Sequence, residues 1–172
     1  MKNKIFIIIG FIFFLFCFAV FYTGLKKPNV YTPILNEDTD LPNFVSNDFF
    51  SGDKVFSEQI FKKKNYYIIN VWASWCSPCR SEHSFLILLK NKNIEMIGVN
   101  YKDNIDSARA FLQELGNPYS KILSDHNGVL SIELGAYGVP ETFIVNQEKK
   151  IIKKIIGPIN EENYKEILKL IK

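Results

Sequence analysis

Two thiols lie three residues apart in Cys76-Ser77-Pro78-Cys79, directly after an apolar, β-rich run over Tyr66–Trp72 that is typical of a buried strand. A CxxC at a turn from a strand into a helix is a candidate redox pair. The free N–H groups and the positive dipole end of the helix stabilise a thiolate on Cys76. Cys76 is therefore predicted to be the exposed nucleophile that attacks a disulfide, and Cys79 the buried thiol that resolves the mixed disulfide.

Other uses of a CxxC stay open at this point. Cys76, Cys79 and His83 could supply three ligands to zinc, although no fourth ligand is evident nearby. Covalent haem attachment needs C-x-x-C-H, and Arg80 follows Cys79, so the chain is not itself a c-type cytochrome. A purely structural disulfide is the third alternative. The redox pair is the prediction, with no metal and no cofactor beyond the Cys76–Cys79 disulfide.

Strands and helices alternate around this turn. The predicted elements are a helix from Cys76 to about Lys90, a strand over Glu95–Asn100, a helix over Asn104–Leu115 capped by Asp103, a short strand over Ser120–Leu123, a short helix over Val129–Leu134, strands over Thr142–Val145 and Ile151–Ile156, and a helix from Asn160 to Lys172. Upstream, Phe44 and Val55-Phe56 flank a turn-rich stretch, which suggests an N-terminal β-hairpin. This order predicts an α/β layered domain with a mixed sheet.

Composition limits the class of protein. The chain has 172 residues, of which 47% are hydrophobic and 23% charged, and this excludes a disordered or low-complexity protein. A net charge of only +3 gives no compositional sign of a nucleic-acid-binding protein. Three cysteines are too few for a disulfide-scaffolded miniprotein.

The N-terminus is predicted to be a membrane element. Seventeen of the eighteen residues over Ile5–Tyr22 are apolar. At about 1.5 Å per residue, a helix from Ile5 to Leu25 reaches roughly 30 Å, enough to cross a bilayer. No A-x-A-like cleavage site follows it, so residues 1–25 are predicted to be an uncleaved signal-anchor, with Cys17 as a lipid-facing bystander. A polar linker over 26–40 and a domain over 41–172 follow, and the flanking charges favour placing that domain outside the cytoplasm.

Several segments carry a family resemblance. WASWCSPC resembles the active site of the thioredoxin superfamily, and Val139-Pro140-Glu141-Thr142 resembles its cis-proline loop. NVWASWCSPCRSEH at 70–83, GVNYKD at 98–103, FLQELGNPY at 111–119 and LGAYGVPETF at 134–143 resemble the membrane-tethered oxidoreductases of cytochrome c maturation, the DsbE/CcmG family. The resemblance covers nearly the whole chain. It implies a thioredoxin-like fold, with a central mixed β-sheet flanked by helices and an N-terminal β-hairpin.

The resemblance also implies roles for single residues. Cys76 and Cys79 match the redox pair. Pro140 matches the cis-proline, and the backbone of Val139 matches the one that pairs with a bound partner strand. Trp75 matches an aromatic residue beside the active site.

Glu82 and Glu141 match the acidic groups of this family's active site. A carboxylate near Cys76 disfavours the thiolate and raises the pKa of that cysteine. Destabilising the reduced form in this way makes the pair a better reductant. We interpret Arg80 as a helix surface charge and His83 as a packed or solvated imidazole.

The function that the resemblance implies is a protein-disulfide reductase on the periplasmic side of a bacterial inner membrane. It would act in cytochrome c biogenesis, on apocytochrome c or on a partner maturation protein, and a transmembrane thiol-reductant carrier would reduce it again. The alternatives are a general periplasmic thiol–disulfide reductase or oxidase and a metal-binding chaperone of thioredoxin-like fold.

Overall fold

A computed structural model of the chain describes residues 2–26, 39–61, 64–92 and 94–171. The chain divides into two compact units, one ending at Ile34 and the other beginning at Leu35. Most of the predicted linker over 26–40 lies outside the described residues.

The first unit contains helix α1 (Lys2–Lys26). Its stretch Lys4–Gly24 has a mean hydropathy of 2.9 and is long and apolar enough to cross a membrane. The large apolar side chains along it, from Ile5 to Tyr22, are exposed within the unit. The helix is therefore a candidate membrane anchor, as the sequence predicts.

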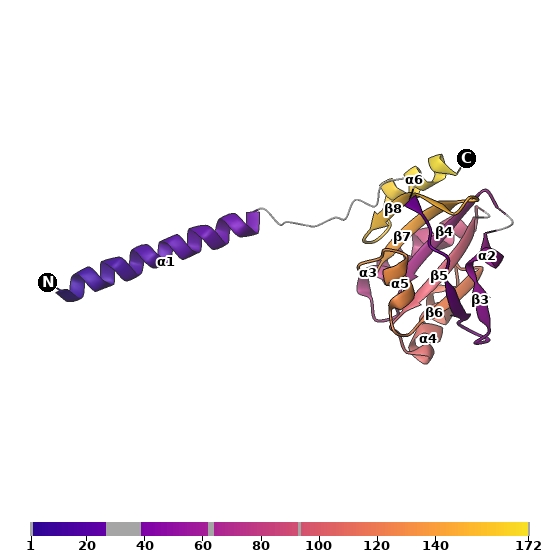
Figure 1. Ribbon diagram of the computed structural model, residues 1–172, viewed down its shortest axis with the longest axis horizontal. Helices are drawn as coiled ribbons and strands as arrows, with labels where there is room; N and C mark the ends of the chain where they lie inside the picture. Colours follow the sequence, from indigo (N-terminus) through magenta and orange to yellow (C-terminus); the bar gives the residue numbers. More distant parts are fainter. Residues whose placement is uncertain (1, 27–38, 62–63, 93, 172) are drawn as a thin grey trace. The chain divides into compact units, whose positions relative to one another are not determined.

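The second unit is built on one sheet. Its described strands are β1 (Thr39–Asp40), β2 (Val45–Asp48), β3 (Lys54–Phe56), β4 (Tyr66–Trp72), β5 (Glu95–Tyr101), β6 (Lys121–Asp125), β7 (Glu141–Asn146) and β8 (Lys150–Ile156). They lie side by side in the order β1-β8-β7-β4-β5-β6-β2-β3 (Figure 1). The pairs β4–β5 and β5–β6 are parallel, and the other pairs are antiparallel. The mixed sheet is thereby confirmed.

Helices cover both faces of this sheet. The described helices are α2 (Ser57–Ile60), α3 (Ser77–Lys90), α4 (Ile105–Leu115), α5 (Val129–Glu133) and α6 (Glu161–Leu170). Side chains alternate along a strand, so Ile68 and Trp72 of β4 face one way and Tyr67 and Ile69 the other. The first pair packs in the core under α3, α4 and α6, which contribute Leu86, Leu89, Ala108, Phe111, Leu112 and Ile167. The opposite core receives Leu130 of α5 and Val55 of the hairpin.

The structure departs from the predicted elements at three points. The hairpin of β2 and β3 is confirmed, but α2 was not predicted. Strand β1 pairs Thr39 with Ile151, so the sheet begins inside the predicted linker. Asp103 is not the cap of α4, because the Asn104 side chain accepts hydrogen bonds from the amides of Asp106 and Ser107.

A glycine in β5 makes room for two stacked aromatic rings. A Cβ at Gly98 would lie 2.9 Å from Trp72 Nε1 and 2.9 Å from Tyr119 ring carbons. Those two rings stack with their centroids 5.6 Å apart, and both are buried. Neither ring can move aside without disturbing the core under α3 and α4.

Gly98→Ala is therefore expected to lower the free energy of unfolding by about 1–3 kcal/mol, because the added methyl overpacks this core. Guanidinium unfolding of the oxidised unit that begins at Leu35 measures the effect. Gly138→Ala is the matched control, since nothing lies within 4 Å of a Cβ there. Equal midpoints for the two variants would contradict the prediction.

Candidate active site

The CxxC and the proline loop meet at one end of the inner strands β4 and β7, and this end of the sheet is called the cysteine edge below. Strand β4 ends at Trp72, just before Cys76, and β7 begins at Glu141, just after Pro140. The two strands are antiparallel neighbours, with Val71 paired to Glu141. The end of one strand therefore lies beside the start of the other, and Val139 packs against the apolar cluster that contains both cysteines.

Cys76 and Cys79 form a disulfide with an S–S distance of 2.03 Å. Cys76 is the N-cap of α3, and the Cys79 amide donates a hydrogen bond to Cys76 Sγ over 3.1 Å. The prediction that Cys76 is exposed is wrong, because this residue is only 4% exposed, whereas Cys79 is buried as predicted. The cap position places Sγ against the amide of the first helical turn. The same amide would donate to a thiolate and stabilise it.

His83 and Arg80 do not join the cysteines. His83 Nε2 lies 2.8 Å from the Gly116 carbonyl, and its ring packs edge-on against Phe111. Burial lowers the pKa of His83, so its imidazole is neutral at pH 7. Arg80 pairs with Glu114 at the surface. Within the described ranges, no three His, Cys, Asp or Glu side chains form a group that could hold a metal.

Glu82 is a fully buried carboxyl group. Its Oε1 accepts a hydrogen bond from Asn70 Nδ2 over 2.9 Å, and its Oε2 accepts one from the Ile159 amide over 2.8 Å. Burial raises the pKa of Glu82 to about 7, although the two donors oppose that rise. Glu82 follows Cys79 by three residues on α3, so the two side chains share one face of the helix. Glu82 is therefore not a solvated surface side chain.

A buried network holds this carboxyl group in place. Asn70 Nδ2 also donates to Thr142 Oγ1 over 3.0 Å, and the Tyr119 hydroxyl donates to Asn70 Oδ1 over 2.7 Å. Burial, and then the charge of Glu82, raise the pKa of Tyr119 well above its usual value. Tyr119 therefore stays a donor at neutral pH. Sequence reasoning missed this network, although Asn70 is the one polar residue in the run Tyr66–Trp72.

Glu141 is buried too, but its charge has a partner. Its Oε1 accepts hydrogen bonds from the Tyr137 amide over 2.8 Å and the Gly138 amide over 3.0 Å. Its Oε2 lies 2.7 Å from Lys154 Nζ. Glu141 thus lies at the start of β7, where its carboxylate binds two amides of the preceding loop and has a cation beside it.

The residues predicted to contact a partner lie at the same edge. The Val139–Pro140 peptide is cis, as predicted. Neither the amide nor the carbonyl of Val139 is hydrogen-bonded within the described part of the chain. Trp75 is 58% exposed, and its Nε1 donates to the Lys102 carbonyl over 3.1 Å.

Asp103 ties the loop before Cys76 to the turn after β5. Its carboxylate accepts hydrogen bonds from the Ser74 amide over 2.5 Å and the Ser74 hydroxyl over 2.7 Å. It also accepts from Asn100 Nδ2 over 2.9 Å and from the Asn104 amide over 2.8 Å. Four donors thus converge on one side chain, which explains why Asp103 does not cap α4.

Asp103→Ala is expected to lower the free energy of unfolding by about 1–3 kcal/mol, since part-buried donors lose their acceptor. Urea unfolding of the oxidised unit that begins at Leu35 tests this expectation. Asp106→Ala is the control, because Asp106 is an exposed carboxylate in the first turn of α4. Losses of equal size in the two variants would show that the Ser74 contacts add nothing.

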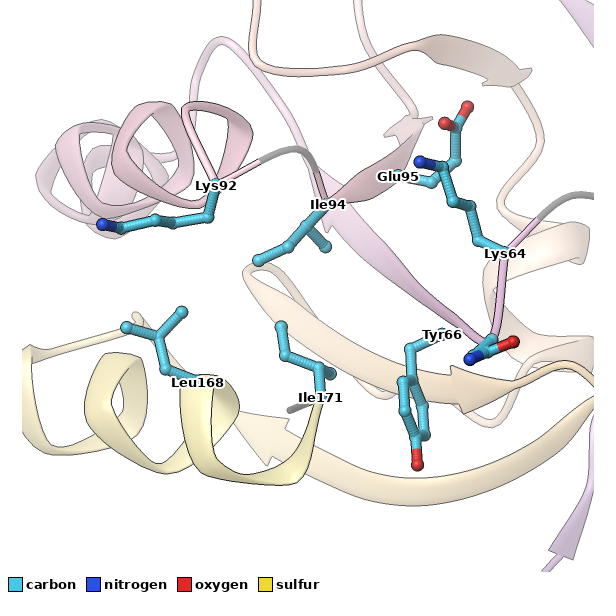
Figure 2. Close-up of a pocket in the computed structure, with 8 residues that line it drawn as sticks. Lys64, Tyr66, Lys92, Ile94, Glu95, Leu168 and Ile171 are labelled. Atoms are coloured by element: carbon cyan, nitrogen blue, oxygen red, sulfur yellow. The ribbon is translucent and has the colours of Figure 1, made fainter.

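A separate pocket of about 440 Å³ lies at the far end of the sheet, where β4 and β5 begin. Figure 2 shows Leu168 and Ile171 on one side of this hollow and Ile94 on the other, with Tyr66 nearby. None of its lining residues belongs to the cysteine edge, so it is no part of the candidate active site.

Comparisons with known proteins agree with this geometry. The family model described as Redoxin matches residues 36–168. The chain is 37% identical over 172 residues to the thiol:disulfide interchange protein DsbE of Vibrio cholerae, covering 96% of this chain and 92% of that protein. It is 42% identical over 107 residues to the thiol:disulfide interchange protein HelX of Rhodobacter capsulatus, covering 62% of this chain and 61% of that one.

Solved structures support the fold. The thioredoxin domain of a thiol-disulfide oxidoreductase from Bacteroides vulgatus superposes with a TM-score of 0.66 at 22% identity, covering 80% of this chain and 99% of that domain. The fold is therefore thioredoxin-like. With its buried cysteine pair beside a cis-proline loop, the chain belongs to the Redoxin family, among the DsbE and HelX thiol:disulfide interchange proteins, and is a thiol–disulfide oxidoreductase.

Proposed function

We propose that this protein reduces a disulfide in the maturation of c-type cytochromes, either in apocytochrome c or in a maturation protein that carries the same electron pair. The observation that carries the proposal is Cys76 at the N-cap of α3, hydrogen-bonded by the Cys79 amide, at the edge where the unbonded backbone of Val139 lies. Haem attachment needs two free thiols in a C-x-x-C-H segment, and an oxidising compartment tends to pair them.

The reaction is a two-electron exchange between dithiols and disulfides. In the reduced protein, the Cys76 thiolate attacks one sulfur of the client disulfide and releases the other as a thiolate, which takes up a proton. The Cys79 thiol then loses its proton and attacks Cys76 Sγ, which releases the second client thiol. The client gains two electrons and two protons, and the protein ends with the Cys76–Cys79 disulfide seen in the structure.

Three residues are proposed to hold the client. The free amide and carbonyl of Val139 can pair with an extended client segment, as a strand added to a sheet edge. The cis bond to Pro140 orients that backbone. The exposed ring of Trp75 offers apolar contact beside the cysteines.

Glu82 and Glu141 are proposed to bias the pair toward reduction. An ionised Glu82 shares a helix face with Cys79 and is screened from water, so it disfavours a thiolate in the reduced pair. The Lys154 cation offsets the charge of Glu141, so the contribution of Glu141 to this bias is the smaller one.

The proposed place of action is the periplasmic face of a bacterial inner membrane, with α1 as a single-pass anchor. The support is the apolar helix Lys4–Gly24 and the similarity to DsbE and HelX proteins. A thiol carrier within the membrane would return two electrons to the Cys76–Cys79 disulfide after each turnover, since an oxidised protein cannot reduce a second client.

Trapping of the client tests the proposal. A Cys79→Ala variant cannot resolve the mixed disulfide, so the client is expected to stay bound to Cys76. Cells that express the full chain are quenched with acid, their free thiols are blocked, and the protein adducts are identified by mass spectrometry. Recovery of apocytochrome c or a maturation protein is expected. Recovery of many unrelated periplasmic proteins would instead support a general reductase.

A further inference from the structure

Lys154 of β8 is a nearly buried cation aimed into the proline loop. Its side chain is 8% exposed, and its Nζ lies 2.7 Å from Glu141 Oε2. Nζ also donates to the Gly135 carbonyl over 2.7 Å and lies 4.2 Å from the centroid of the Tyr137 ring. One ammonium group therefore contacts Gly135 and Tyr137 of the loop over 135–140 and the carboxylate of Glu141 directly after it.

These contacts fix the loop over 135–140 from both sides. Lys154 holds its start at Gly135, and Glu141 receives the amides of Tyr137 and Gly138 from within it. The part of the loop that these contacts leave facing outward includes the Tyr137 ring, which is 60% exposed. Val139, with its free backbone groups, is two residues further along.

The pair of Lys154 and Glu141 is better suited to fixing a conformation than to adding stability. Removing two charges from water costs about as much as their attraction returns, so apolar residues in their place often stabilise a fold equally well. A cation held against an aromatic face, by contrast, favours one orientation of that ring. Tyrosine is also among the residues enriched where proteins contact partners.

We infer that Lys154 is a positioning residue for partner binding, which holds the loop over 135–140 so that the Tyr137 ring and the Val139 backbone face a docked peptide. The inference rests on the proposed function, because it takes an oxidised peptide segment as the ligand of this edge. Lys154 does not touch the reacting sulfurs and takes no part in the exchange itself.

The test compares a peptide disulfide with a disulfide too small to reach the loop. The full chain in detergent is reduced, freed of reductant and mixed with excess oxidised C-x-x-C-H peptide or with hydroxyethyl disulfide, and its thiols are counted after an acid quench. Lys154→Met is expected to raise the half-saturating peptide concentration about five- to tenfold, as expected for the loss of one cation–aromatic contact. The rate with hydroxyethyl disulfide corrects for any change at the sulfurs, because Lys154→Met leaves Glu141 without its cation and shifts the reduction potential for both disulfides alike.

Two further variants separate positioning from folding. Lys154→Arg keeps a cation and is expected to restore binding, whereas Lys153→Met removes a neighbouring lysine paired with Glu166 and is expected to change nothing. Because Lys154→Met leaves a buried Glu141 charge unpaired and thereby destabilises the fold, Lys154→Met is also combined with Glu141→Gln. The double variant keeps the amide acceptor and is expected to fold while still binding the peptide weakly. Wild-type binding by the double variant, or equal slowing with both disulfides, would overturn the inference.

A second oxidised peptide, in which another residue replaces the histidine of C-x-x-C-H, keeps the two proposals apart. Equal rates of the unaltered protein with both peptides would count against the cytochrome client, while weaker binding of both peptides by Lys154→Met would still support the positioning role. Unchanged binding of both peptides by Lys154→Met would refute that role and leave the client proposal intact.

Discussion

Replacing Cys76 by serine is expected to lower the rate of disulfide reduction to the uncatalysed background, a fall of about a thousandfold or more. A serine hydroxyl does not ionise near neutral pH and cannot form a disulfide, so both the nucleophile and the two-electron couple are lost. The fold should tolerate the change, because a serine is a good N-cap for α3. Reduction of an oxidised peptide, followed by titration of the released thiols, measures the loss.

Cys17→Ser is the matched control for this loss. Cys17 is the free cysteine among the described residues, and it is exposed on α1, in the other unit of the chain. The Cys17→Ser variant is expected to keep the full rate. Comparable losses in the two variants, or a Cys76→Ser variant that remains active, would remove Cys76 from the mechanism.

The buried carboxyl group of Glu82 is expected to make stability depend on pH. Its pKa rises from 4.5 in the unfolded chain to about 7 in the folded protein. Between these values the folded protein holds a proton that the unfolded chain has released, so this proton stabilises the fold. The contribution is fully present below pH 4.5 and is lost as the pH rises through about 7. The full shift corresponds to about 3.5 kcal/mol at about 1.4 kcal/mol per pKa unit.

Glu82→Gln separates this contribution from other titrations. His83 acts in the opposite direction, because its pKa is lowered and protonation at acid pH favours the unfolded chain. The difference in unfolding free energy between the Glu82→Gln variant and the unaltered oxidised unit removes the His83 contribution. That difference is expected to move in favour of the variant by about 3 kcal/mol between pH 4.5 and pH 8. Denaturant titrations at four pH values between these limits measure the change.

The same titrations would also reveal a Glu82 whose pKa is not shifted by folding. In the oxidised protein both cysteines are bonded and do not titrate, so no thiol contributes to the slope. Parallel pH curves for the variant and the unaltered protein would mean that Glu82 has the same pKa in the folded protein as in the unfolded chain, near that of an ordinary carboxyl group. Its proposed influence on the cysteine pair would then begin at a lower pH.

Local sequence patterns predicted much of the architecture. The apolar run Tyr66–Trp72 and the CxxC after it predicted β4 and the start of α3, because strand periodicity and helix capping are local in the chain. The cis-proline loop followed from its resemblance to a known family. Asp103 and Asn104 are both good N-caps, and local rules could not decide between them. The choice depends on Ser74, which donates to Asp103 from a distant segment.

Contacts across the fold explain what sequence reasoning missed. Asn70 meets Tyr119 and Thr142 from positions 49 and 72 residues away, so their network is invisible along the chain. Lys154 lies in KKIIKKII and looks like any surface lysine there. Only the pairing of β7 with β8 brings it to Glu141. Cys76 is less exposed than expected because its cap position draws Sγ toward the Cys79 amide.

Strand β1 bears on how the domain would respond to a mechanical load. The chain enters the sheet at Thr39, and only two residues of β1 pair with β8, helped by a bond from the Leu41 amide to the Lys149 carbonyl. A pull along the chain from the N-terminal side would act first on this edge, which can peel open one bond at a time. Strands β4 and β7, which carry the cysteine edge, are paired over six residues each and lie further inside the sheet. Strand β1 would then separate from β8 under load before the redox site is distorted.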